Sequence, residues 1–192
     1  MGRFSVIPAD TFNALQLDAG VLLTTFDPSS PTITDEAIIT ATTGGIQIST
    51  TPTYSDMGED VDNCPVNTKE LKHLDSWEVS ASTTSLGTSP DLIRLALGAA
   101  DVTTASGKIT PRTTLNQTDF STIWWVGDKA DGGFVAAKLI NALSTGGFAL
   151  QTSKNGKGQT SLTITCHPSI NAQTVVPVEY YSIDGEEETT EP

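Results

Sequence analysis

The sequence predicts an all-β fold, an up-and-down or sandwich sheet, with one short α-helix beside it. Between residues 119 and 166, runs of β-branched and aromatic residues alternate with glycine-rich breakers, as in consecutive antiparallel strands. Threonine makes up roughly one residue in six, which suits strands with one solvated face. One segment, about residues 90–97, carries clear start and stop signals of a helix.

The N-terminal half predicts several strands and one long loop. The expected strands are residues 20–26, a hairpin of 36–41 with 46–51, and 76–83. The hairpin would turn at Gly44-Gly45, and an irregular acidic segment, about residues 52–68, would follow it. In the strand 76–83, alternation puts Trp77, Val79 and Ala81 on one face.

The helix has well-defined ends and an unusually wide apolar surface. Ser89 is an N-cap residue, Pro90 occupies the first helical position, and Gly98 ends the helix. Its apolar side chains cover an arc of about 200°, whereas a helix on one sheet needs about 100°. We therefore expect a second contact, either with a neighbouring subunit through residues such as Leu92 and Leu95 or with long loops of the same chain.

The C-terminal half predicts five strands and an acidic end. The expected strands are residues 119–126, 134–143, 148–152, 161–166 and 175–183. Pro177 makes the last of them an edge or bent strand, because proline cannot donate to a sheet ladder. Residues 1–183 are expected to form one domain, and residues 184–192 a disordered acidic tail.

Composition limits the classes of function. The chain of 192 residues has a net charge of −13 and a pI near 4.3, which argues against gripping nucleic acid through phosphate contacts. No signal-peptide pattern or membrane-length apolar run is visible, so we expect synthesis in the cytoplasm and no membrane contact. Cys64 and Cys166 would pair in a secreted domain but stay separate thiols in the cytoplasm, where we expect them.

The sequence contains no recognisable catalytic or ligand-binding motif. His73 and His167 lack zinc-site spacing, and the acids of residues 56–63 do not follow the EF-hand pattern. No P-loop, dinucleotide-binding or nucleophile-elbow pattern occurs. We therefore nominate no catalytic, cofactor-binding or metal-binding residue and expect a protein that is not an enzyme.

Trp124 and Trp125 are adjacent in one expected strand and so point to opposite faces. One of them fits the core, and the other needs cover from an inter-subunit interface or a stacked sugar ring. This leaves an alternative open, a cell-surface or carbohydrate-binding β-sandwich module.

Several segments together resemble the major tail tube proteins of long-tailed, siphovirus-type phages that infect Gram-positive bacteria. They are residues 20–26 (GVLLTTF), 54–63 (YSDMGEDVDN), 74–77 (LDSW), 123–128 (IWWVGD) and 141–148 (NALSTGGF). The resemblance spans about residues 20–183. It implies a β-sandwich or barrel of the tail tube type, with a flanking helix.

The resemblance also implies a role. Copies would form hexameric rings that stack into the virion tail tube, with tape measure, distal tail and tail terminator proteins as further partners. DNA would pass through the tube without tight binding. A lumen with excess negative charge and no lysine-lined groove fits this role, because a basic lining would hold the phosphates.

The acidic loop is the expected contact between rings. Its candidate contact residues are Tyr54, Asp56, Met57, Glu59, Asp60 and Asp62. We expect the loop to be disordered in the free subunit, because its acids lack partners, and to be ordered by lysines of a neighbour. The candidate lysines are Lys69, Lys72, Lys154 and Lys157.

Overall fold

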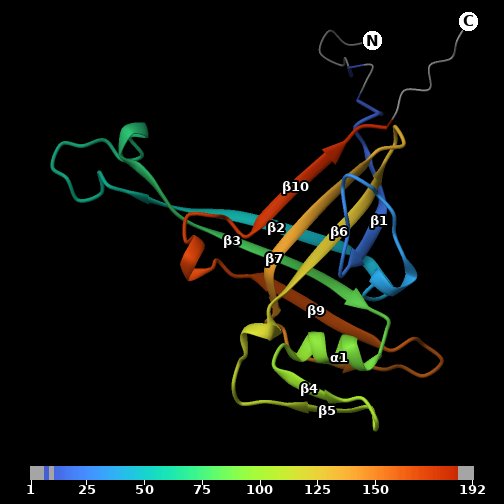
Figure 1. The fold of residues 1–192 in the computed structure, drawn as a ribbon. Coiled ribbons are helices and arrows are strands. Elements are labelled where there is room, and N and C mark those ends of the chain that lie inside the picture. The colour runs from blue at the N-terminus through green and yellow to red at the C-terminus, as the bar shows by residue number, and fades with distance from the viewer. Residues whose placement is uncertain (1–6, 9–10, 186–192) are drawn as a thin grey trace, which may run out of the picture.

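The computed structural model describes residues 7–8 and 11–185, and it confirms an all-β fold built mainly on one antiparallel sheet (Figure 1). The sheet order is β1 (Gln16–Leu23), β6 (Ser121–Lys129), β7 (Phe134–Ser144), β9 (Gln159–Cys166), β3 (Lys72–Ser85) and β2 (Thr42–Asp56). Two further strands, β10 (Val178–Ile183) and β8 (Leu150–Gln151), pair with β7 and β9 respectively. A separate hairpin joins β4 (Ala100–Thr103) to β5 (Lys108–Pro111).

The sheet divides along β7 into two wings. One edge of β7 pairs with β10 from Phe134 to Leu139 and then with β9 from Ala142 to Ser144. Between these two stretches, Asn141 has a φ of 50°, a left-handed conformation that asparagine tolerates better than most residues. The wing of β2, β3 and β9 thereby turns away from the wing of β1, β6, β7 and β10.

The main core lies between the two wings and α1. Its buried residues are Leu22, Val79, Ala81, Ala96, Ile123, Leu139, Ala142, Leu162, Ile164 and Cys166. A second cluster covers the other face of β1, β6 and β7, with Leu23, Ala37, Trp124, Val126 and Ala136. Strands β6 and β7 are therefore packed on both faces, and they form the rigid centre of the molecule.

The helix α1 (Pro90–Leu97) has the predicted bounds and caps. Ser89 Oγ accepts a hydrogen bond from the Leu92 amide at 3.3 Å, and Gly98 ends the helix with a φ of 73°. Leu92 and Ala96 are buried, and the β4–β5 hairpin packs along the helix away from the sheet. Segments of the same chain therefore supply a second contact for the wide apolar surface.

Four short 3-10 segments complete the described elements. They are η1 (Asp35–Ala37), η2 (Lys69–Leu71), η3 (Gln117–Asp119) and η4 (Ile170–Ala172). No helix in the described part of the chain is long and apolar enough to cross a membrane.

The predicted hairpin of residues 36–41 and 46–51 is wrong. Glu36 lies in η1, and Gly44 and Gly45 lie inside β2, which pairs with β3. Both glycines have positive φ values, and the β2–β3 register shifts between Thr43 and Ile46. The two glycines make a bulge in a continuous strand, because a bulge uses the same left-handed conformations as a tight turn.

Several predicted boundaries also change. The first strand is Gln16–Leu23 instead of 20–26, β8 has only two residues instead of five, and the last strand begins at Val178, directly after Pro177. Strand β3 is longer than the predicted 76–83, and residues 52–56 of the predicted loop belong to β2. Of the predicted tail, residues 184 and 185 are described, and Lys129 Nζ forms an ion pair with Asp184. Residues 186–192 lie outside the described residues.

The double packing of the central strands gives a stability prediction. Leu139 is fully buried on β7, so Leu139→Ala should lower the free energy of unfolding by about 2–5 kcal/mol through lost burial and the cavity left behind. Leu115→Ala, at a side chain that is 51% exposed, should change it by less than about 0.5 kcal/mol. Urea denaturation measures both, and equal effects would contradict the assignment of the core.

Candidate functional site

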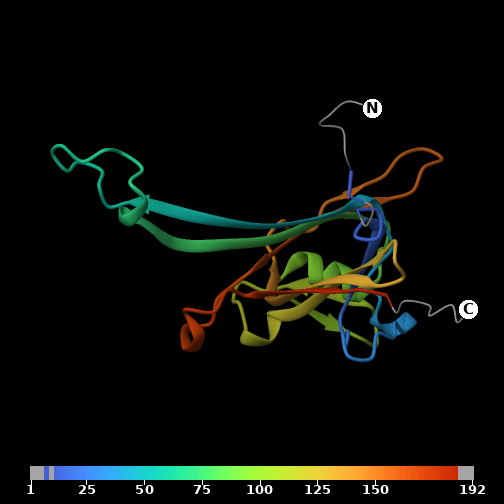
Figure 2. The same ribbon diagram turned by 90° about the horizontal axis from the view of Figure 1, so that it is seen from above.

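The most distinctive surface is a two-stranded arm that projects from the sheet. Strand β3 pairs with β2 along its whole length but with β9 only from Ser80 to Ser85. Residues 51–78, called the arm below, therefore extend past β9 as a two-stranded ribbon (Figures 1 and 2). At the base of the arm, Leu74 to Trp77 face Pro168 and residues 173–177 across a cavity of about 420 Å³. An isolated two-stranded ribbon is only marginally stable in water, so the arm is suited to being covered by a partner.

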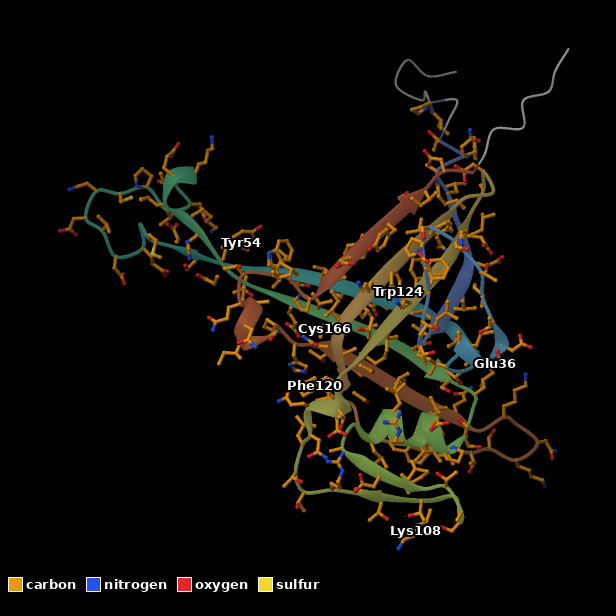
Figure 3. All side chains as sticks on the ribbon, viewed as in Figure 1. Glu36, Tyr54, Lys108, Phe120, Trp124 and Cys166 are labelled. Atoms are coloured by element: carbon orange, nitrogen blue, oxygen red, sulfur yellow. The ribbon has the colours of Figure 1, made fainter. Side chains whose placement is uncertain are left out.

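Large apolar side chains are exposed along the arm. Tyr54 is 53% exposed, Met57 59% and Trp77 38% (Tyr54 is labelled in Figure 3). Val61, Val66 and Leu74 are exposed as well. Contiguous apolar surface of this kind marks interaction sites in soluble proteins.

The structure gathers the predicted loop contacts at the outer end of the arm. Tyr54 and Asp56 lie on β2, and Met57, Glu59, Asp60 and Asp62 lie in the turn region that follows. This region is not the turnless loop that the sequence predicted. Backbone hydrogen bonds close successive turns, such as those from the amide of Glu59 to the Asp56 carbonyl and from the amide of Val61 to the Gly58 carbonyl.

Asp56 also differs from the prediction, because its carboxylate has partners within the chain. It accepts hydrogen bonds from the amides of Gly58 at 2.9 Å and Asn67 at 2.6 Å. These two bonds hold the pKa of Asp56 below its usual value of 3.8, and the positive charge of Lys72 lowers it further. Asp56 thus connects the beginning and the end of the turn region, at Gly58 and Asn67, to the end of β2.

The two cysteines are separate, free thiols. Cys64 lies half-buried in the turn region of the arm, and Cys166 is buried in the main core. Burial raises the pKa of the Cys166 thiol to about 11. The expectation of unpaired thiols is confirmed by this arrangement.

A second surface is the outer face of β2, β3 and β9, which carries mainly hydroxyl side chains. Val79, Ala81 and Ile164 point into the core, so the alternate positions in each strand point outward. These positions are Gln47, Ser49, Thr51, Thr53, Ser76, Glu78, Ser80, Ser82, Thr84, Ser161, Thr163 and Thr165. We call this the hydroxyl face.

The hydroxyl face is nearly free of charge. Glu78 is its one ionisable side chain, and none of its positions is a lysine or an arginine. Neighbouring hydroxyl groups form hydrogen bonds with one another. An example at the border of the face is the 2.8 Å bond between Thr145 Oγ1 and Thr165 Oγ1. Such a surface offers a passing polyanion no cationic partner.

The other four predicted contact residues lie in the body, away from the arm. Trp124 is 6% exposed, packs edge-on against Phe26 and has Lys138 Nζ over its ring. Trp125 is half-buried on the opposite face, and its Nε1 donates to the Ala19 carbonyl at 3.0 Å. The chain itself thus covers Trp124 and about half-covers Trp125, so the two tryptophans give little support to the carbohydrate-binding alternative.

Leu92 and Leu95 both lie on α1, where Leu92 is buried and Leu95 is half-buried. Both line a cavity of about 490 Å³ beside η1 and β6, with Glu36 and Arg94 among the other lining residues. Their contact with another subunit stays a prediction.

Sequence reasoning missed Trp77 and Leu74 as surface residues. Alternation placed Trp77 correctly on the core-facing side of β3, but β9 ends before it can cover that position. The only signal was the difference in length between the two strands, which a sequence does not show before the pairing is known.

No group of three or more potential metal-ligating side chains occurs in the part of the chain that the structure describes. No protein-family model and no curated protein matches this chain.

Two solved structures contain chains that are similar to this one. One is the tail of an empty gene transfer agent particle with C6 symmetry, at 12% identity and a TM-score of 0.40, covering 79% of this chain and 92% of that chain. The other is the virion of a native gene transfer agent particle, at 12% identity and a TM-score of 0.40, covering 85% of this chain and 95% of that one. At these values the likeness carries no inference about function, which is argued below from the surfaces of this chain.

The contacts of Asp56 predict a pH-dependent arm. The pKa of Asp56 is lower in the folded chain than its usual value of 3.8. The charged Asp56 carboxylate therefore stabilises the arm above pH 3.8, and this stabilisation is lost as the pH falls below 3.8 and through the lowered pKa. Asp56→Ala should therefore increase amide hydrogen exchange in residues 57–68 at neutral pH and leave the body unchanged. Glu59→Ala, at an exposed carboxylate of the same turn region, is the matched control and should leave exchange unchanged. Equal exchange in wild type and Asp56→Ala would contradict the fastening role.

Proposed function

We propose that this chain is a structural subunit of a phage-like tail tube, assembled from copies of itself. The arm is the observation that carries the proposal. It presents exposed apolar side chains on a ribbon that β9 leaves unpaired, and such a ribbon gains stability when another chain packs on it. A self-assembling subunit needs an element that reaches beyond its own body in this way.

The hydroxyl face supports the same function. A conduit for DNA requires a lining that does not bind phosphates, and this face combines hydroxyl groups with one carboxylate. We propose that it faces the bore. The rest of the net charge of −13 then lies elsewhere on the subunit, so this lining is less negative than the sequence alone predicted.

The finer parts of the proposal come from the resemblance seen in the sequence. They are hexameric rings that stack, a place in the virion tail of a long-tailed phage, and assembly with tape measure, distal tail and tail terminator proteins. We propose no catalytic activity, because neither proposed surface requires a reacting group.

Assembly tests the proposal directly. Concentrated protein, alone or with tail assembly partners, should form rings or tubes of even diameter in negative-stain electron microscopy. The double variant Tyr54→Ser/Met57→Ser should fold with nearly unchanged stability, because more than half of each side chain is exposed, but should lose assembly. Leu115→Ser, an exposed residue away from the arm, should assemble normally. Wild-type protein that stays monomeric under all these conditions would refute the proposal.

The position of the hydroxyl face predicts how tubes treat DNA. Wild-type tubes should not retain duplex DNA at about 0.1 M salt, whereas Ser82→Lys/Thr163→Lys tubes should retain it with a steep salt dependence. Ser106→Lys, placed in the turn between β4 and β5, controls for added charge alone. DNA binding by the control equal to that of the double variant would show that the hydroxyl face does not line the bore.

A further inference from the structure

The outer end of the arm carries three exposed carboxylates that no ion pair neutralises. The arm tip, defined as residues 57–68, contains Glu59, Asp60 and Asp62, all exposed, and no lysine or arginine. None of these acids takes part in an ion pair of the described residues. Asp56 needs no cation, because two backbone amides already satisfy it.

The two lysines of the arm are unsuited to balance the tip. Lys72 Nζ donates to the side chain of Asn67 at 3.0 Å, and Lys69 lies in η2 behind the tip. Glu70 and Asp75 lie close to these lysines in the sequence, so this part of the arm is not a basic surface. Of the lysines that the sequence suggested, Lys154 and Lys157 remain.

Lys154 and Lys157 lie together in a loop that lacks acids. This basic loop, residues 152–158, connects β8 to β9, and both lysines are exposed. In contrast, Arg112, Lys129 and Lys138 are already paired with carboxylates of the chain. Among the described residues, no other turn presents two exposed lysines without an acid beside them.

Arm tip and basic loop lie at opposite ends of the molecule. In Figures 1 and 2 the arm reaches to the left, while the loop that precedes β9 lies at the far right. The two segments therefore do not meet within one subunit. A head-to-tail contact between copies brings them together, and repetition of such a contact gives a closed ring or an extended array.

We propose that the arm tip of one copy docks on the basic loop of the next copy, through Glu59, Asp60 and Asp62 against Lys154 and Lys157. This inference rests on the proposed function, since it names the partner segment of the arm. Leu150, which lies on β8 just before the basic loop, is 45% exposed. It offers an apolar contact for Met57 or Val61 of the arm tip of the other copy. The charge pairs then determine how the arm tip is positioned on the basic loop, and the apolar contact adds affinity.

Charge reversal with complementation tests the pairing. Glu59→Lys/Asp62→Lys (the tip variant) and Lys154→Glu/Lys157→Glu (the loop variant) should each raise the concentration needed for assembly about tenfold or more, because attraction becomes repulsion at every contact. A mixture of the two variants should assemble, since every contact between unlike copies pairs opposite charges again. An even-numbered ring accommodates this alternation. Sedimentation velocity and electron microscopy give the readouts.

Matched controls separate this contact from general effects of charge. Lys108→Glu at the start of β5 and Asp35→Lys in η1 change exposed charges outside both segments and should assemble like wild type. Wild-type assembly should also weaken with salt, since exposed charges are screened over about 10 Å at 0.1 M.

The outcomes separate the inference from the proposed function. If the tip or loop variant assembles like wild type, or if the mixture fails to assemble while both controls do, the pairing is wrong, although the tube function stands. If wild type itself never associates, the proposed function fails, and the inference fails with it. The pairing is supported if neither variant assembles by itself and the mixture of the two variants does.

Discussion

The unequal lengths of neighbouring strands determine the shape of this molecule. Strand β3 has 14 residues, but β9 covers it only from Ser80 to Ser85, so the first half of β3 finds hydrogen-bond partners on β2 alone. Beyond that point Trp77 stays on the core-facing side of β3, but β9 does not reach it, and a register shift between Thr53 and Tyr54 then interrupts the alternation toward the tip. The arm, its apolar surface and its need for a partner all follow from this mismatch.

The distribution of charged side chains is also consistent with self-association through the arm. The body satisfies its buried or half-buried cations internally, as Lys129 does with Asp131 and Asp184, so they are not available to partners. The arm tip carries negative charge, and the basic loop positive charge, that takes part in no ion pair of the described residues. Strands β2, β3 and β9 connect these two segments, and their outer side is the nearly uncharged hydroxyl face. A surface for self-association and a surface that avoids phosphates can thus coexist on one acidic subunit.

Local signals made part of this structure predictable. The helix was found with correct ends because Ser89, Pro90 and Gly98 act within one turn of it, and β7 was found because glycines flank it at both ends. In contrast, Gly127 does not end β6 but lies inside it. Long-range pairing was not predictable. Gly44 and Gly45 have the same conformational freedom in a bulge as in a turn, and only the pairing of β2 with β3 decides between them. The acidic residues of the arm tip were visible in the sequence, and their role as contacts stays a prediction. The exposure of Trp77 was missed because it depends on where β9 ends.

The central claim is that another copy of the chain covers the arm. A three-dimensional reconstruction of the assembled protein by electron cryomicroscopy, at a resolution that shows side chains, tests it most directly. The account predicts that Tyr54, Trp77 and the arm tip are buried against a neighbouring copy, with the hydroxyl face toward the bore. An assembly in which the arm projects freely into solvent, or in which a lysine-lined surface faces the bore, would contradict it.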